Sequence, residues 1–510
     1  MLRLPLRDCA RVTGATLREE DAAVDVAGVG IDTRTLRPGM LYAAIRGERF
    51  DGHDFVAAAE QGGASAVLVE RDVETTLPRL LVEDVRAALG TLAHHWAQHH
   101  QVPIVAVTGS NGKTTVKEIV AAILGQLGPV LATKGNLNND LGVPLTLFGL
   151  APEHRYAVVE IGANAPGEIA ALSAIACPDV GIITNIGPAH LEGFGSLPGV
   201  AKAKSELFAA LGHDGVAVFD ADDAFAGTLR AAASHCRRCE FGTAAGTAVR
   251  GAFRRTVDAS PAGLSVDVHG ERMEADFALE GEHNLRNALA AIAAVRCLDV
   301  QMETIAAGLG SVRAVPGRLQ RSRGLGGATL IDDTYNANPA SVLAALEVLA
   351  THAGERHLVL GDMAELGEGA RASHAEIGVA AHRLGMRALW TVGPLAEAAR
   401  IAWRDERAGS DSTVTRSVAG AAAPGDDDVL APDARRRDDG AHDDGAHDDG
   451  AHCDDVETLI RALAPRLDER ATVLVKGSRS ARMERVVAAL RQGGDEPPAD
   501  ESPAPSESAA

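Results

Sequence analysis

Short apolar runs alternate with segments of helical apolar spacing along most of this chain. From about residue 101 to 312, the β-rich runs fall at 103–107, 157–161, 180–184 and 216–219. A strand–helix order of this kind is typical of a doubly wound, mostly parallel sheet, so we predict an α/β fold. In such sheets, ligands bind at the carboxyl ends of the strands, and the polar motifs of this chain fall there.

A glycine loop, Thr-Gly-Ser-Asn-Gly-Lys-Thr-Thr at 108–115, joins the first of these runs to a helical segment at 116–124. Backbone N–H groups and a helix N-terminus can cradle phosphates in that context. Lys113 would face the β/γ-phosphates, and the Thr114 hydroxyl would be a Mg²⁺ ligand. The loop is shorter than the common Walker pattern, and glycines alone would also suit an ordinary turn. Together the motif predicts an ATP site, formed by Gly109, Ser110, Asn111, Gly112, Lys113, Thr114 and Thr115.

The length of 510 residues suggests about three domains at ~150 residues each. β-like runs at 67–69 and 80–82 belong to a first α/β region, and a third such region has strands expected at 328–332, 357–361, 387–392 and 471–475. We therefore predict a smaller N-terminal α/β domain at 1–84, a central P-loop-type ATP-binding domain at 85–312, and a Rossmann-like C-terminal domain at 313–492.

Two stretches have the composition of disordered chain. Residues 405–455 carry Asp-Asp-Gly-Ala-His three times in tandem, and the tail at 493–510 is rich in Pro, Glu, Ser and Ala. The repeat contains His442, His447 and His452. Their spacing of five suits no helical face, and a repeat expansion explains them more simply than a metal site.

Charge and cysteine usage narrow the classes of partner. A formal net charge of −21 argues against nucleic acid or an anionic membrane as a partner. The N-terminus lacks a signal-peptide core, and no run approaches the ~20 apolar residues of a membrane helix. Six scattered cysteines do not form a disulfide framework, and Cys236 and Cys239 form a lone C-x-x-C pair. We expect a soluble, cytoplasmic monomer.

Polar residues follow the next two central strands. Glu160 stands at the end of one strand, where a carboxylate can reach a metal, and a salt bridge or a cap would explain it equally well. His190 follows the third strand, and Lys204 comes fourteen residues later on an expected helix. A structural histidine and a solvated surface lysine are the ordinary interpretations of these two.

Taken in order, the motifs resemble the Mur ligase family of peptidoglycan synthesis. They are the glycine loop, Glu-Ile-Gly-Ala-Asn at 160–164, Asn-Ile-Gly-Pro-Ala-His at 185–190, the spacing from His190 to Lys204, Gly-Glu-His-Asn-Leu-Arg-Asn-Ala at 281–288 and Pro-Gly-Arg at 316–318. Segments 51–55, 332–339, 361–367 and 476–479 resemble the member that adds D-alanyl-D-alanine. The Asp-Asn-Pro-Arg motif of the diaminopimelate- or lysine-adding member is absent, because Ala340 follows Pro339. The resemblance covers nearly all of the chain except 405–455 and the tail.

The resemblance implies an ATP-dependent, ADP-forming amide ligase. It would add D-Ala-D-Ala to UDP-N-acetylmuramoyl-tripeptide through an acyl phosphate, in peptidoglycan precursor synthesis, with ATP and two Mg²⁺ ions. Lys113, Glu160, His190 and Lys204 would be the catalytic residues. Thr114 and Glu160 would hold one Mg²⁺, and His190 with a carbamylated Lys204 would hold the second, since a carbamate supplies an oxygen ligand.

The resemblance also assigns binding residues. Further ATP contacts would be Asn284, Asn287, Arg318 and Asp333. The UDP-sugar-peptide would contact Thr33, Arg34, Gly47, Asp51, Gly52, His53, Asn136, Asn138 and Asn139, and the acceptor would contact Tyr335, Asn336 and Asn338. Lys476 and Arg479 are candidates for binding the dipeptide carboxylate, and interdomain contacts would explain them equally well.

Two other functions fit parts of the sequence. A folylpolyglutamate-type ligase would not need the first-domain motifs, and a catalytically dead nucleotide-binding relative would not need Glu160, His190 and Lys204 together. The motifs leave both diaminopimelate and lysine open as the third residue of the accepted peptide.

Overall fold

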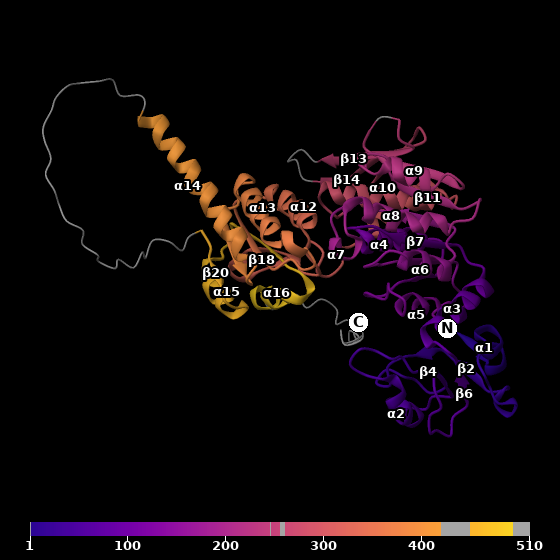
Figure 1. Cartoon of the computed structure of the whole chain (residues 1–510). Helices are drawn as coiled ribbons and strands as arrows, with labels where there is room; N and C mark the ends of the chain where they lie inside the picture. Colours follow the sequence, from indigo (N-terminus) through magenta and orange to yellow (C-terminus); the bar gives the residue numbers. More distant parts are fainter. Residues whose placement is uncertain (1, 245, 256–260, 420–448, 493–510) are drawn as a thin grey trace, which may run out of the picture. The chain divides into compact units, whose positions relative to one another are not determined.

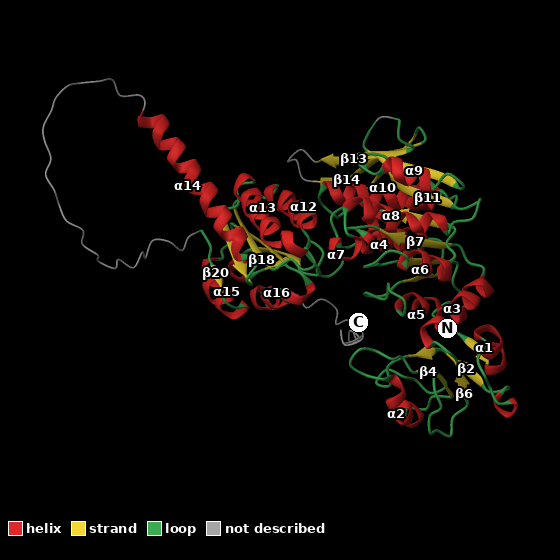
Figure 2. Ribbon diagram, viewed as in Figure 1, coloured by secondary structure: helices red, strands yellow, loops and turns green. Residues whose placement is uncertain are grey.

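The computed structural model describes residues 2–244, 246–255, 261–419 and 449–492 (Figure 1). The chain divides into two compact units between Arg313 and Ala314. Figure 2 shows helices and sheets in both units. The predicted α/β class with mostly parallel sheets is confirmed.

A nine-stranded sheet forms the centre of the first unit. Its spatial order is β15 (Glu271–Ala275), β14 (Pro261–Val268), β13 (Val249–Arg255), β12 (Arg237–Gly242), β11 (Val216–Asp220), β10 (Val180–Ile183), β7 (Ile104–Thr108), β9 (Tyr156–Glu160) and β8 (Val130–Ala132). The strands from β8 to β13 are parallel, and β13, β14 and β15 pair antiparallel. The four central strands predicted from the sequence are all present.

Helices cover both faces of this sheet because its strands are apolar on both sides. In β7, Ile104 and Ala106 enter one core while Val105 and Val107 enter another. The helices of the unit outside its N-terminal part are α3 (Val85–His100), α4 (Lys113–Leu124), α5 (Gly142–Leu147), α6 (Glu168–Ala176), α7 (Leu191–Phe194), α8 (Leu197–Ala209), α9 (Ala226–Ala232), α10 (Glu282–Arg296) and α11 (Met302–Ser311). Helices α4, α10 and α11 pack in one layer, and α3, α6 and α8 in the other.

The N-terminal part of this unit has a parallel four-stranded sheet and a two-stranded antiparallel one. Its elements are β1 (Arg3–Pro5), α1 (Leu6–Thr13), β2 (Asp25–Ala27), β3 (Val29–Gly30), β4 (Leu41–Ala43), α2 (Val56–Gln61), β5 (Ala66–Val69) and β6 (Arg79–Leu81). The predicted boundary at 84/85 coincides with the start of α3, whose N-cap is Asp84. The domain boundary itself stays a prediction.

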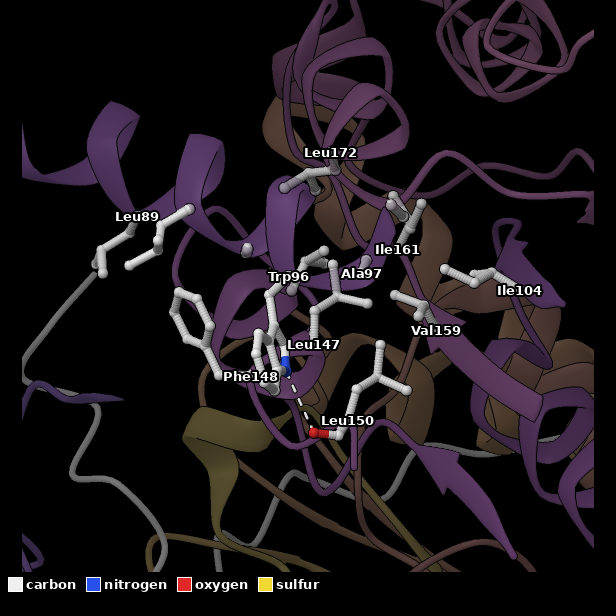
Figure 3. Packing of buried hydrophobic residues seen from close by; sticks show 14 of the residues in the cluster. Leu89, Trp96, Ala97, Ile104, Leu147, Phe148, Leu150, Val159, Ile161 and Leu172 are labelled. Carbon is white, nitrogen blue, oxygen red and sulfur yellow. Dashed lines mark hydrogen bonds between the residues drawn. The ribbon is translucent and has the colours of Figure 1, made fainter. Parts of the chain in front are cut away.

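One hydrophobic core runs through the N-terminal part and into the central sheet. Leu2 and Leu6 belong to the same buried cluster as Trp96, Leu147 and residues of β7. The Leu2 amide donates to the Phe148 carbonyl at 2.8 Å. Figure 3 shows Trp96 within this cluster, with its indole N–H donating to the Leu150 carbonyl at 3.2 Å.

A six-stranded sheet forms the second unit. Its order is β16 (Gln320–Arg323), β17 (Thr329–Asp333), β21 (Ala471–Lys476), β18 (Glu355–Gly361), β19 (Ala388–Val392) and β20 (His452–Cys453), and only the β16–β17 pairing is antiparallel. The helices are α12 (Pro339–Ala350), α13 (Ala370–Arg383), α14 (Glu397–Ala419), α15 (Val456–Leu463) and α16 (Glu484–Leu490).

The predicted disordered insert, 405–455, includes residues at both of its ends that the structure shows in regular elements. Helix α14 continues to Ala419, and β20 adds an edge strand in which His452 accepts or donates a 3.0 Å hydrogen bond with Thr391 Oγ1. Arg400 also holds Asp449 at 2.7 Å. Composition does not predict that these ends are structured, because the contacts that hold them come from residues elsewhere in the second unit, such as Thr391 and Arg400. Residues 420–448, with His442 and His447, and the tail from 493 lie outside the described residues.

Within the described ranges, no helix is both long and apolar enough to cross a bilayer. The same residues hold no group of three or more His, Cys, Asp or Glu side chains arranged for a metal ion.

Candidate active site

Three neighbouring parallel strands end at one edge of the central sheet. β7 lies between β10 and β9, with Ile183 paired to Thr108 and Val107 to Glu160. The glycine loop follows β7, Glu160 ends β9, and Asn185 follows β10. The topology therefore brings the three motifs together at the edge where ligands of open α/β sheets bind.

The segment after β10 braces the glycine loop through hydrogen bonds. The Asn111 carbonyl accepts from Thr184 Oγ1 at 2.6 Å and from Asn185 Nδ2 at 2.9 Å. Ser110 Oγ donates to the Gly187 carbonyl at 2.9 Å and accepts from the Gly187 amide at the same distance. The loop is thus preorganised by its neighbour, which is a favourable state for a binding site.

Two glycines of the loop are required by close approach and by positive φ. Gly109 has φ +150°, and a Cβ there would lie 1.8 Å from Thr184 Oγ1. Gly112 has φ +82°, and a Cβ there would lie 2.3 Å from the amide oxygen of Asn287. Asn287 in turn donates to Asn284 Oδ1 at 3.1 Å, so α10 presents both asparagines beside the start of α4.

Glu160 is 2 % exposed and has both carboxylate oxygens engaged. Thr114 Oγ1 donates to Oε2 and Asn138 Nδ2 to Oε1, each at 2.8 Å. The Lys113 ammonium donates to the Gly109 carbonyl at 2.9 Å, beside the same helix start. A carboxylate and a hydroxyl are hard oxygen donors, so this pair fits a Mg²⁺ ion.

Lys204 is buried, not a surface charge. On α8 it is 1 % exposed, and its ammonium lies 5.8 Å from the centroid of the Phe194 ring. Burial, and then the charge of Lys113, hold the pKa of Lys204 well below its ordinary value. No described residue gives this ammonium an anionic partner. The His190 ring lies 6.5 Å from the same Phe194 ring, so Phe194 adjoins both side chains.

The N-terminal motif forms a tight polar cluster around Asp51. Its Oδ1 accepts from the His53 amide at 3.0 Å and from His53 Nδ1 at 2.6 Å, and its Oδ2 accepts from Arg71 at 3.1 Å. Desolvation opposes ionisation, but these bonds hold the pKa of Asp51 well below its usual range. His53 is buried, and its Nε2 accepts from the Glu70 amide at 2.9 Å. A side chain at Gly52 would collide with the Ile45 backbone at 2.6 Å.

Other residues predicted for the sugar nucleotide have local partners. Arg34 is exposed and pairs with Asp32 at 2.6 Å, next to half-buried Thr33, and Gly47 closes a turn on Phe50. Asn139 Oδ1 accepts from the Gly142 amide at 2.9 Å at the start of α5. Asn136 is exposed, and its carbonyl accepts from the amide of Asn138. Asn138 itself is directed at Glu160.

Five of the predicted residues form three contacts in the second unit. Lys476 donates to Asp333 Oδ2 at 2.5 Å and to the Asn336 carbonyl at 3.0 Å. The Arg318 guanidinium lies 4.2 Å from the centroid of the Tyr335 ring. Lys476 therefore already has an anionic partner in Asp333.

Asn338 has a structural role that the motif did not reveal. Its side-chain oxygen accepts from the Ser341 amide at 2.9 Å, and Ser341 Oγ accepts from the Asn338 amide at 3.0 Å. This is a capping box at the start of α12. The signal was present in the sequence, as an asparagine followed by proline and, two residues later, by serine.

Two residues beside the site were missed altogether. Lys117 is 2 % exposed on α4, three residues after Thr114, and Thr133 is 1 % exposed directly after β8. Lys117 could have been found as a charge at a buried position among Val116, Ile119 and Val120 of a helix with regular apolar spacing. Thr133 carries no comparable signal, because its role depends on strand pairing.

Family models match three successive parts of the chain. The model of the Mur ligase family catalytic domain matches residues 25–97, the Mur ligase middle domain 107–295, and the Mur ligase glutamate ligase domain 317–479.

Full-length relatives agree with these matches. The UDP-N-acetylmuramoyl-tripeptide--D-alanyl-D-alanine ligase of Escherichia coli (strain K12) is 38% identical over 97% of this chain and 100% of its own. A crystal structure of MurF from Acinetobacter baumannii superposes with a TM-score of 0.81 at 32% identity, covering 96% of this chain and 99% of that one. MurF ligase from Thermotoga maritima in complex with ADP gives 0.73 at 27% identity, covering 91% and 97%.

Proposed function

The chain belongs to the Mur ligase family, and on that basis we propose that it joins D-alanyl-D-alanine to UDP-N-acetylmuramoyl-tripeptide with hydrolysis of ATP to ADP. The geometry that carries this proposal is the grouping of Thr114, Glu160 and buried Lys204 with Lys113 around the start of α4. Identity with the E. coli ligase extends over all of that protein, so the three parts needed for nucleotide, sugar and acceptor are all represented. The reaction belongs to peptidoglycan precursor synthesis, and we place the protein in the cytoplasm as a monomer.

ATP would bind on the glycine loop. The loop amides and the N-terminus of α4 face an anion favourably, and Lys113 adds a positive charge for the β/γ-phosphates. Its present bond to the Gly109 carbonyl would be exchanged for phosphate oxygens. Asn284 and Asn287 back the loop. Arg318 and Asp333 are proposed as further ATP contacts from the resemblance of their motifs to the family.

Glu160 and Thr114 would hold Mg²⁺, which neutralises charge on the phosphates when bound. The tripeptide carboxylate attacks the γ-phosphorus, and ADP leaves with the β–γ bridging oxygen. The dipeptide amine then attacks the acyl carbon, loses a proton, and expels phosphate. The chain's own contribution is to align these groups and exclude water from the acyl phosphate.

Lys204 is proposed to act as a carbamate. Its amine adds to CO₂ and releases one proton, which gives an N-bound carboxylate. The reaction requires a neutral amine, and the lowered pKa of Lys204 increases that form at neutral pH. The resulting anion would supply, with His190, an oxygen and nitrogen pair for a second Mg²⁺.

The cluster around Asp51, with Thr33, Arg34 and Gly47, is proposed to receive the sugar nucleotide. Arg46 and Arg71 pair with Asp51, and Arg34 pairs with Asp32; all three side chains are exposed, so cationic groups are available for a diphosphate. Tyr335 and Asn336 are proposed to contact the dipeptide, whose amide bond suits an uncharged partner.

Phosphate release tests the proposal. The purified protein is given ATP, Mg²⁺ and the UDP-muramoyl-tripeptide, with D-Ala-D-Ala, D-Ala, lysine or diaminopimelate as acceptor. We expect sustained release and a new amide product only with the dipeptide. Preference for a single amino acid would refute the acceptor assignment, and turnover with a folyl substrate instead of the tripeptide would refute the reaction.

A further inference from the structure

Lys117 is a buried cation next to the proposed Mg²⁺ ligands but makes no contact with them. Its ammonium donates to the Thr133 carbonyl at 2.6 Å and pairs with Glu118, on the helix surface, at 2.7 Å. Burying a lysine costs free energy unless its protons find partners. Its partner Thr133 directly follows β8, and the next strand, β9, carries Glu160.

Thr133 links this lysine to Glu160. Its hydroxyl accepts from the Glu160 amide at 2.9 Å, and its own amide donates to the Val158 carbonyl at 3.0 Å. The side chain of Glu160 accepts from Thr114, which lies one helical turn before Lys117. Thr114, Glu160, Thr133 and Lys117 therefore form a closed ring of hydrogen bonds and helix backbone.

The position of β8 explains why such a tether is needed. β8 is the outermost strand of the nine-stranded sheet, and within the described ranges it pairs only with β9. An edge strand has sheet partners on one side only, so its end is free to shift unless another element holds it. Lys117 supplies that contact from α4 by donating to the Thr133 carbonyl.

We propose that Lys117 is a positioning residue, which fixes the backbone of Glu160 through Thr133 and so sets the metal affinity of the Glu160–Thr114 pair. This inference rests on the proposed function only in taking Glu160 as a Mg²⁺ ligand. Partners one step removed from a metal ligand change metal affinity or activity about 10–100-fold when they are replaced.

Mn²⁺ binding in the presence of ADP, followed by electron paramagnetic resonance, measures this affinity without turnover. We expect Lys117→Met to weaken Mn²⁺ binding about tenfold. Lys117→Arg, which can still donate to the Thr133 carbonyl, should recover most of it. Two matched controls should leave Mn²⁺ affinity unchanged: Ile123→Val, which loosens the same helix, and Lys202→Met, which removes an exposed lysine from α8.

Thr133→Val keeps the carbonyl that Lys117 uses and removes the hydroxyl that holds Glu160. We expect the same tenfold loss, and Thr133→Ser should behave as the wild type. Unchanged Mn²⁺ affinity in folded Lys117→Met or Thr133→Val overturns the proposal. A wild-type protein that binds Mn²⁺ with ADP but never releases phosphate would refute the proposed reaction alone.

Discussion

The ammonium of Lys476 lies 2.5 Å from the carboxylate of Asp333, and both side chains are nearly buried at 3% and 12% exposure. They end the adjacent parallel strands β21 and β17, where Asp333 pairs directly with Lys476 in the sheet register. The pair therefore anchors the start of the 333–339 segment at the edge of the second sheet.

Breaking this pair should be costly. We expect Lys476→Met to lower the free energy of unfolding of the second unit by about 3–5 kcal/mol, because it leaves a buried carboxylate without its counter-charge. Chemical denaturation followed by the fluorescence of Trp390 and Trp403 measures it. Arg11→Ala, which removes an exposed pair with Asp8 in the first unit, should cost about 0–1 kcal/mol. Additive effects of Lys476→Met and Asp333→Asn would contradict the pairing.

Replacing Lys204 should distinguish a role as a positive charge from a role as a carbamate that supplies an oxygen ligand. We expect Lys204→Ala to nearly abolish ligation and a small carboxylate such as acetate to restore part of it. Lys204→Arg should be no better, because a guanidinium supplies charge without an oxygen ligand. Product formation with and without added acetate is the measurement, and an active arginine variant would rule out the carbamate.

Acid should destabilise the second unit through His374. This fully buried ring accepts from the Met363 amide at 2.9 Å and donates to the Ala370 carbonyl at 2.7 Å. Desolvation lowers the pKa of His374 below its ordinary 6.5, so the native state stays neutral where the unfolded chain takes up a proton. Stability is therefore complete above about pH 6.5 and falls as pH drops from there toward the folded pKa, by at most about 1.4 kcal/mol per pH unit.

Comparison with His374→Gln isolates the contribution of His374 to the pH dependence of stability, since glutamine cannot titrate but can still accept from the Met363 amide. Urea denaturation at pH 7.5 and 5.5 should show a smaller loss for the variant than for the wild type. Equal losses would assign the pH dependence to other groups.

The segment 420–448 should be dispensable. Its sequence is rich in Asp, Gly and Ala and poor in large apolar residues, and each doubling of the length of a connecting segment costs only ~0.6 kcal/mol. Replacement by a short Gly/Ser linker should leave ligation within a few-fold. Extending the replacement through 449–453 should lower the melting temperature, because it removes Asp449 from Arg400 and deletes β20. Loss of ligation by orders of magnitude in the folded shorter deletion would contradict this expectation.

The sequence predicted most of what is local and repeated. Apolar runs located β7, β9, β10 and β11 within a residue or so. The ends of these runs located the glycine loop and Glu160, because the residues that end a strand are its direct neighbours in the sequence. The partners of Lys117, Thr133 and Asn138 were not accessible, since they come from strands that meet only in the sheet. The burial of Lys204 could not be predicted for the same reason, because the residues that pack over a single lysine are set by the tertiary structure.

The continuous core of the first unit decides where this protein can be cut. Leu89 and Trp96 of α3 pack in the same cluster as Leu2 and Leu6. A fragment starting at residue 85 would lose the N-terminal side of that cluster and expose an apolar face to solvent, which favours aggregation. A fragment ending at Arg313 would keep the cluster whole. For fragment screening or crystallisation of separate pieces, the division at Arg313 is therefore the sound place to truncate, even though three family models match the chain.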